Sequence, residues 1–195
     1  EHRLYYYPKP KKGEKPVVYT YPVSIGKMDW KTPLGKTRIT QKEKNPNWYP
    51  PASVRKEHAE RGDPLPAVVP PGPDNPLGAY KMRLAFGGGS YLIHGTNNPA
   101  AVGMAITHGC IRMFPEDIAE FYTMIPVNTK VNLIDQTTKV GWSRGSLFIE
   151  RQAPLEGTDN PSHMDPAELD RVVKAATAGV DVSIDWDTAR LAFQQ

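Results

Sequence analysis

One stretch of the chain, residues 91–113, reads Y-L-I-H-G-T-N-N-P-A-A-V-G-M-A-I-T-H-G-C-I-R-M. It holds Cys110, the only cysteine among 195 residues, and two of the five histidines, His94 and His108. A lone cysteine cannot form an internal disulfide, so it is either a small buried hydrophobe or a reactive thiol. Gly109 permits a tight backbone turn immediately before the sulfur. Two imidazoles and a turn around one thiol favour the reactive interpretation.

A thiol with an ordinary pKa of about 8.5 is only a few per cent thiolate at neutral pH. An imidazole corrects this, either by forming an ion pair or by accepting the proton as the sulfur attacks. His108 is nearer to Cys110 in the sequence, whereas His94 reaches it if the preceding hairpin folds over the loop. The ligand spacing typical of a metal site is absent. These residues therefore predict Cys–His acyl transfer without a metal ion or a diffusible cofactor.

The order of the motif residues carries a family resemblance. His94-Gly95 followed by T-H-G-C-I-R (residues 107–112) resembles the L,D-transpeptidase catalytic domain, often called the YkuD domain. The resemblance extends to S-I-G-K-M-D-W-K-T-P-L-G (24–35), N-P-N-W-Y-P-P (45–51) and G-P-D-N-P-L-G-A-Y (72–80). These segments look like those of the periplasmic ErfK/YbiS-type members of Gram-negative bacteria. The similarity covers about residues 2–150 and is loose beyond them.

The resemblance assigns roles to the motif residues. It implies that Cys110 is the nucleophile and His94 the base, with the carbonyl of Gly95 orienting the imidazole. His108 then either lies on the substrate side or packs against the residues that carry out the reaction. Because no Asp or Glu occurs between residues 75 and 115, a backbone carbonyl is the expected partner of the base.

Further residues are candidates for binding substrate. Backbone N–H groups around His108, Gly109 and Cys110 are expected to hold the oxyanion, since a glycine-containing turn aims several donors at one point. Arg112 is either a bidentate ligand for a substrate carboxylate or a salt-bridge partner that stabilises the loop. The remaining candidates are Thr107 beside the oxyanion loop and, lining a groove, Tyr80, Tyr91, Met104 and Trp48, although aromatic residues at strand spacing are also typical of a core.

The resemblance also implies an activity, that of a peptidoglycan L,D-transpeptidase acting in cell-wall biogenesis and cell shape. The thiolate would attack the amide after meso-diaminopimelate in a tetrapeptide stem, expel D-alanine, and pass the acyl group to an amine. The expected acceptor is the C-terminal lysine of an outer-membrane lipoprotein. A second stem peptide, giving 3-3 cross-links, and water, giving a hydrolase, are the alternatives. The family is expected to react with carbapenems. A non-catalytic wall-binding module with a buried cysteine is a further alternative.

Composition excludes several other classes. The net charge of +3 is too small and too dispersed to indicate nucleic-acid binding. No run of 18 or more apolar residues occurs, so the sequence predicts no membrane span. No signal peptide is recognisable, and the periplasmic location implied by the resemblance therefore requires a signal that has been removed or was never included in this sequence.

Short strands and turn signals predict a mainly β fold. Strands are expected near residues 2–7, 17–25, 37–40, 78–86, 90–94, 130–134 and 146–150. Pro115 begins a predicted helix with one apolar face. The resemblance implies a YkuD-type β-sandwich of mixed sheets with this one central helix, forming a catalytic domain over residues 1–150.

Two segments stand apart from this pattern. Residues 41–77 contain nine prolines in 37 positions and are interpreted as a loop that covers the cleft, with Trp48 or Tyr49 against the domain. A solvated insertion is the alternative. Residues 151–195 are expected to form a small α/β appendage. It would contain a helix from Asp165-Pro166 to about residue 178 that Gly179 ends, a strand over 180–185 and a short helix over 187–193.

Overall fold

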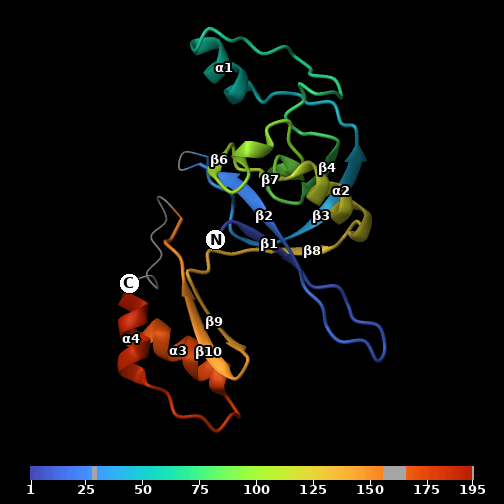
Figure 1. Ribbon diagram of the computed structural model, residues 1–195. Helices are drawn as coiled ribbons and strands as arrows, with labels where there is room; N and C mark the ends of the chain where they lie inside the picture. Colours follow the sequence, from blue (N-terminus) through green and yellow to red (C-terminus); the bar gives the residue numbers. More distant parts are fainter. Residues whose placement is uncertain (28–29, 156–165, 195) are drawn as a thin grey trace. The chain divides into compact units, whose positions relative to one another are not determined.

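The computed structural model describes residues 1–27, 30–155 and 166–194 (Figure 1). Contacts divide the chain into two compact units, His2–Leu133 and Ile134–Gln195, and Glu1 belongs with the second. This division differs from the expected boundary at residue 150. Residues 138–151 form strands that belong to the second unit, because their apolar side chains pack against its helices.

The first unit is built on one mixed sheet of eight strands. Their order is β1-β2-β7-β5-β4-β3-β8, and β6 pairs with β2. The β5–β7 and β2–β6 pairs are parallel and the remaining pairs are antiparallel. The strands are β1 (Arg3–Tyr6), β2 (Tyr19–Gly26), β3 (Gly35–Lys44), β4 (Tyr80–Leu84), β5 (Leu92–His94), β6 (Ala105–Thr107), β7 (Ile111–Met113) and β8 (Lys130–Leu133). The predicted mainly β class is confirmed.

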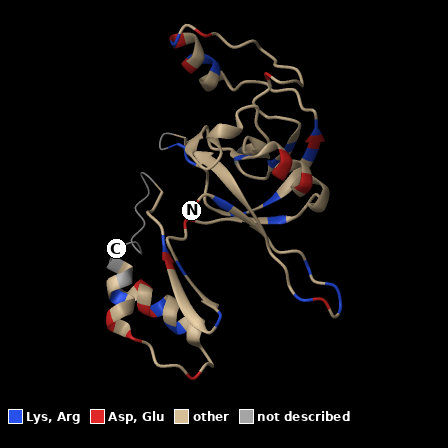
Figure 2. Cartoon of the chain, viewed as in Figure 1, with Lys and Arg blue, Asp and Glu red and all other residues tan. Residues whose placement is uncertain are grey.

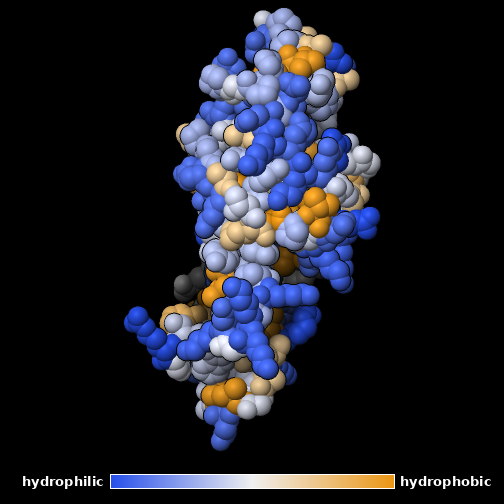
Figure 3. Space-filling view, turned by 90° about the vertical axis from the view of Figure 1, so that its right-hand side faces the viewer, coloured by the Kyte–Doolittle hydropathy of each residue, from blue (hydrophilic) through white to orange (hydrophobic). Residues whose placement is uncertain are grey.

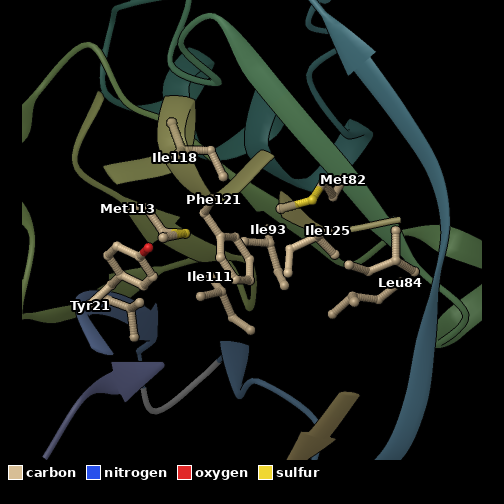
Figure 4. Close-up of a cluster of buried hydrophobic side chains, with 11 residues drawn as sticks. Tyr21, Met82, Leu84, Ile93, Ile111, Met113, Ile118, Phe121 and Ile125 are labelled. Atoms are coloured by element: carbon tan, nitrogen blue, oxygen red, sulfur yellow. The ribbon is translucent and has the colours of Figure 1, made fainter. Parts of the chain in front are cut away.

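A single apolar cluster fills this unit. Strands β2, β3, β4, β5 and β7 contribute buried side chains to it, and helix α2 (Pro115–Met124) contributes Ile118 and Phe121 (Figure 4). Side chains from β1 and from β8, the two ends of the strand order, also pack against the same cluster. The sheet therefore wraps around one core. Full burial of each large apolar side chain contributes about 1.5–3 kcal/mol.

Both ends of α2 are stabilised by charge. Pro115 occupies the first turn together with Glu116 and Asp117, as the sequence predicted. Acidic groups at this end stabilise the helix by interacting with its dipole. At the other end, Lys42 Nζ of β3 donates to the carbonyls of Tyr122 and Ile125 at 2.5 and 2.6 Å. Lys42 thus binds the carbonyls that a helix C-terminus leaves unpaired and ties β3 to α2.

The segment between β3 and β4 differs from the expected loop. Strand β3 continues to Lys44, and helix α1 occupies Ala52–Glu60. Prolines lie before this helix at Pro50 and Pro51 and after it at Pro64, with none between. Proline is tolerated at the start of a helix and disruptive inside one. A long structureless loop was therefore the wrong interpretation of residues 41–44 and 52–60.

Asn75 holds the irregular part of this insertion together. Its buried Nδ2 lies within hydrogen-bonding distance of the carbonyls of Pro46, Val69 and Pro70, at 2.8, 3.2 and 3.1 Å. Its Oδ1 accepts from the backbone N–H of Leu77 at 2.9 Å. The Asn75 side chain thus supplies hydrogen bonds to backbone groups in a segment whose prolines have no backbone N–H to donate.

The second unit is a β-hairpin with two helices. Strands β9 (Thr138–Ser143) and β10 (Ser146–Arg151) are antiparallel, and α3 (Pro166–Thr177) and α4 (Trp186–Gln194) pack on them. Both helices were predicted, and Gly179 adopts φ +76° after the first. Asp165, the expected N-cap, lies outside the described residues. The strand expected over residues 180–185 was wrong. Asp185 instead accepts from the backbone N–H of Thr188 at 3.0 Å and caps α4.

Two further short elements, the 3-10 turns η2 (Gly87–Gly89) and η3 (Pro99–Ala101), complete the described structure. Basic and acidic residues are interspersed along α1, α3 and α4 (Figure 2). On the face shown in Figure 3, hydrophilic residues predominate and hydrophobic ones form separate small patches. Among the described residues, no helix has the length and apolar character needed to cross a membrane.

The role of Asn75 gives a prediction for stability. Asn75→Asp keeps the shape but places a carboxylate oxygen against three carbonyl oxygens, and a buried group that loses its partners costs at least about 2 kcal/mol. We expect a lower midpoint in urea unfolding and faster proteolysis within residues 45–78. Asn47→Asp is the matched control, because Asn47 is exposed in the same insertion. Equal behaviour of the two variants would contradict the role given to Asn75.

Candidate functional site

The nucleophile candidate, Cys110, directly precedes β7 at the end of a short turn. Thr107 Oγ1 donates to the carbonyl of Cys110 at 2.6 Å and closes this turn. Gly109 adopts φ +95°, and a Cβ there would lie 2.8 Å from Cε1 of Tyr91. Only glycine fits this backbone conformation and this contact without strain. We refer to residues 107–110 as the nucleophile loop.

The register of the parallel β5–β7 pair explains which side chains meet. Ile93 is paired with Ile111, and His94 with Arg112. Ile93 and Ile111 are buried in the core. Side chains alternate between the faces of a strand, so His94, Arg112 and Cys110 project from the opposite face. The core thereby fixes the side on which the polar residues gather.

His94 is a buried base candidate with a defined partner. Its Nδ1 lies 2.7 Å from the carbonyl oxygen of Gly95. Donation of Nδ1–H to this carbonyl leaves Nε2 with the lone pair that a base requires. Burial, and secondarily the charge of Arg112, lowers the pKa of His94 to about 4, although backbone hydrogen bonds with Gly95 and Leu77 act in the opposite direction. The imidazole is therefore neutral at physiological pH.

Cys110 is also neutral in the resting protein. Burial raises the pKa of its thiol, and a backbone hydrogen bond with Leu92 and the charge of Arg112 only partly oppose this. The Sγ lies 3.9 Å from the carbonyl oxygen of Ser90. Within the described residues, no hydrogen bond joins Sγ to His94. If these two groups react together, their neutral resting forms call for proton transfer during attack and not for a preformed ion pair.

Arg112 supplies the positive charge near both groups. Burial lowers the pKa of its guanidinium, and its Nε is buried without a hydrogen-bond partner in the described part of the chain. None of the salt bridges among those residues involves Arg112. The structural alternative for Arg112, a salt bridge that stabilises the loop, is therefore not found there.

His108 makes a contact that the sequence did not reveal. Its Nε2 lies 2.7 Å from Oε2 of Glu57 on α1, and its ring packs edge-on against Trp30 with centroids 5.1 Å apart. Lys27 Nζ lies 3.1 Å from the other oxygen of Glu57. Hydrogen bonds from His108 and then from Lys27 lower the pKa of Glu57 to about 2. Sequence reasoning missed Glu57 and Lys27. The proline-free run that forms α1 was the one available signal.

The groove candidates lie in different surroundings. Tyr91 contacts Gly109, next to the thiol. The Tyr80 ring instead packs on Tyr122 of α2, with centroids 4.9 Å apart. Trp48 is half-buried and pairs with Val69 inside the insertion, whereas Tyr49 is 64% exposed and Met104 is 53% exposed. Of these residues, Tyr91 is the one that the structure brings against the nucleophile loop.

The insertion reaches the site at two points. Glu57 contacts His108, and the end of the insertion packs on Gly95, where a Cβ would lie 3.3 Å from the carbonyl oxygen of Leu77. The segment therefore touches both the nucleophile loop and the strand end that carries the base. Within residues 1–27, 30–155 and 166–194, no cluster of three or more His, Cys, Asp or Glu side chains could hold a metal ion. The arrangement is suited to nucleophilic acyl transfer by a thiol and an imidazole.

Comparison with known proteins gives consistent matches. The model of the YkuD family, the L,D-transpeptidase catalytic domain, matches residues 1–133. "Probable L,D-transpeptidase YbiS" of Escherichia coli (strain K12) is 38% identical over 187 residues, which cover 93% of this chain and 59% of that protein. "Probable L,D-transpeptidase YcfS" of the same strain is 39% identical over 179 residues, covering 90% and 55%.

The chain thus spans between half and two thirds of the length of these curated relatives. Among solved structures, LD transpeptidase LdtMt1 in complex with imipenem is similar at 19% identity and a TM-score of 0.42, covering 62% of this chain and 50% of that one. The match to the family model covers well over half of the chain and includes every motif residue described above. The chain belongs to the L,D-transpeptidase catalytic domain family.

Proposed function

We propose that the protein is a cysteine L,D-transpeptidase that transfers the acyl group of a peptidoglycan stem peptide through a thioester on Cys110. The observation that carries this proposal is the position of the only cysteine on a tight turn directly before β7, whose parallel partner β5 carries the buried neutral His94 with its Nδ1 at the carbonyl of Gly95. Family membership supplies the substrate class.

In the acylation step, Sγ of Cys110 attacks the carbonyl carbon of the amide that follows meso-diaminopimelate. His94 accepts the thiol proton as the C–S bond forms, because neither group carries a charge at rest. Collapse of the tetrahedral intermediate breaks the C–N bond, and His94 returns the proton to the leaving amine of D-alanine. The product is a thioester with neutral His94.

The nucleophile loop provides the electrostatic part of the proposal. Backbone N–H groups around His108, Gly109 and Cys110 would stabilise the oxyanion, and the positive φ of Gly109 turns the backbone at this point. Thr107 supports the turn from within and does not itself need to touch substrate. Arg112, with a buried and unpartnered Nε, is suited to bind a substrate carboxylate.

For the second step we propose the side-chain amine of a C-terminal lysine of an outer-membrane lipoprotein as the acceptor. The amine would attack the thioester while His94 takes its proton, and the thiol would be regenerated. The insertion supports this choice, because it touches both sides of the site and so favours a slim peptide terminus over a glycan-linked stem. With these substrates, the reaction would take place in the periplasm.

An acceptor competition tests the proposal. The protein is incubated with a tetrapeptide muropeptide, together with a lysine-ended peptide, and the products are identified by mass spectrometry. We expect release of D-alanine and a dominant muropeptide–lysine conjugate. Diaminopimelate–diaminopimelate dimers as the main product would overturn the lipoprotein assignment alone, and free tripeptide alone would indicate a hydrolase.

Substitution of the motif residues tests their roles. Cys110→Ala is expected to abolish acyl-enzyme formation, and His94→Ala to slow it by about 10²–10⁴-fold, as is typical for loss of a general base. His108→Ala should retain measurable activity, about tenfold below the wild type, because a positioned loop tolerates partial loss of support. Intact-mass measurement over time reports acylation. An inactive His108→Ala beside an active His94→Ala would reverse the assignment of the base.

Carbapenems give a test that does not depend on the acceptor. Family membership implies that such a β-lactam acylates Cys110, because the strained lactam carbonyl takes the place of the stem-peptide amide. We expect a mass increase of one carbapenem molecule on the wild type and none on Cys110→Ser. Most penicillins are expected to react poorly. An unmodified protein whose Cys110 still reacts with iodoacetamide would contradict this prediction.

A further inference from the structure

Three segments that are distant in the sequence meet at one carboxylate, that of Glu57 on α1. Its Oε2 accepts from His108 Nε2 at 2.7 Å, and its Oε1 lies 3.1 Å from Lys27 Nζ. Arg61, one turn further along α1, also lies against Oε1. His108 belongs to the nucleophile loop, and Lys27 follows the end of β2. Glu57 therefore joins the insertion to two segments of the catalytic unit.

Those two segments are themselves packed closely. The backbone N–H of Lys27 donates to the carbonyl of Thr107 at 3.0 Å, and Thr32 Oγ1 donates to the carbonyl of Gly109 at 3.0 Å. A Cβ on Gly26 would lie 2.9 Å from Cα of Gly109. Gly26, Lys27 and Thr32 thus support the nucleophile loop. The carboxylate of Glu57 holds the His108 side chain of the same loop.

The contact is part-buried and lies near solvent, which limits its contribution to stability. The side chains of Glu57 and His108 are 22% and 31% exposed, and ion pairs near solvent contribute little to the free energy of unfolding. The contact matters more for the orientation of the His108 ring than for the free energy of unfolding. The Glu57 carboxylate fixes the ring orientation of His108, which is the residue before Gly109 and two before the thiol.

We propose that Glu57 is a positioning residue for acyl transfer. Through His108 it holds the nucleophile loop in the conformation that aims its backbone N–H groups at the substrate carbonyl, so that this conformation depends on the seating of α1. This inference rests on the proposed function and adds a residue outside the motif to its machinery. Errors of about 1 Å in such a loop cost up to about 10²-fold in rate.

The alternative is that Glu57 only stabilises α1 through its ion pair with Arg61, which lies four residues later in the sequence. The helix contains its own control. Glu60 pairs with Lys56 at 3.8 Å, also four residues apart, and both partners are well exposed. Replacing either glutamate with alanine removes one such pair and introduces a good helix former. Only Glu57→Ala removes the contact with His108.

The experiment compares Glu57→Ala, Glu60→Ala, His108→Ala and the Glu57→Ala/His108→Ala double variant in the full chain. Release of D-alanine from a tetrapeptide muropeptide gives kcat and KM, and hydrogen exchange reports the amides of residues 105–113. We expect Glu57→Ala to lower kcat about tenfold with little change in KM and to speed exchange in the loop. Glu60→Ala should stay within about twofold of wild type. The double variant should match His108→Ala alone, because Glu57 acts through that ring.

Equal activity of Glu57→Ala and Glu60→Ala would overturn the proposal, as would multiplying effects in the double variant or a fully active His108→Ala. Should the wild type release no D-alanine, the proposed function fails, and hydrogen exchange then decides the positioning role. Faster loop exchange in Glu57→Ala alone would retain that role, and identical exchange in both glutamate variants would remove it.

Discussion

The parallel pairing of β5 with β7 is the constraint on which the site depends. It sets Ile93 beside Ile111 and His94 beside Arg112 in one register. A shift by one residue would exchange the buried isoleucines with the polar side chains, so the apolar core enforces the register of the site. α2 and the strands on either side bury the isoleucine face. The same pair of strands therefore contributes its isoleucines to the core and sets the positions of His94 and Arg112.

Burial of the site has a chemical consequence as well as a structural one. The same removal from water lowers the pKa of His94 and raises that of Cys110, so the pair rests without charge. A neutral pair costs less to bury than an ion pair. Under the proposed function, the thiol would stay unreactive until a substrate carbonyl carbon is in place and the oxyanion donors can act.

Local features of the sequence carried most of the predictions that the structure confirms. The 3.6-residue period of α2, with the proline and acidic residues at its start, was sufficient to predict that helix. The glycines between β4 and β5 were sufficient to predict the turn that separates those strands. Contacts between distant side chains left no such trace. Lys42 caps a helix whose carbonyls are 80 and 83 positions away, and Glu57 meets His108 51 positions away. The strand expected over residues 180–185 is not formed, and Asp185 caps α4 instead.

The insertion begins and ends at one point of the sheet. Lys44 of β3 is paired with Tyr80 of β4, and the N–H of Asn45 donates to the carbonyl of Ala79 at 2.8 Å. The segment between Asn45 and Ala79 is therefore the loop of one long β-hairpin, and the hydrogen bonds between β3 and β4 close it. Doubling the length of such a loop costs only about 0.6 kcal/mol in closure entropy. This segment can therefore change in length without moving the strands that flank it, and a replacement that keeps the proposed positioning role would also have to supply a partner for His108 in place of Glu57.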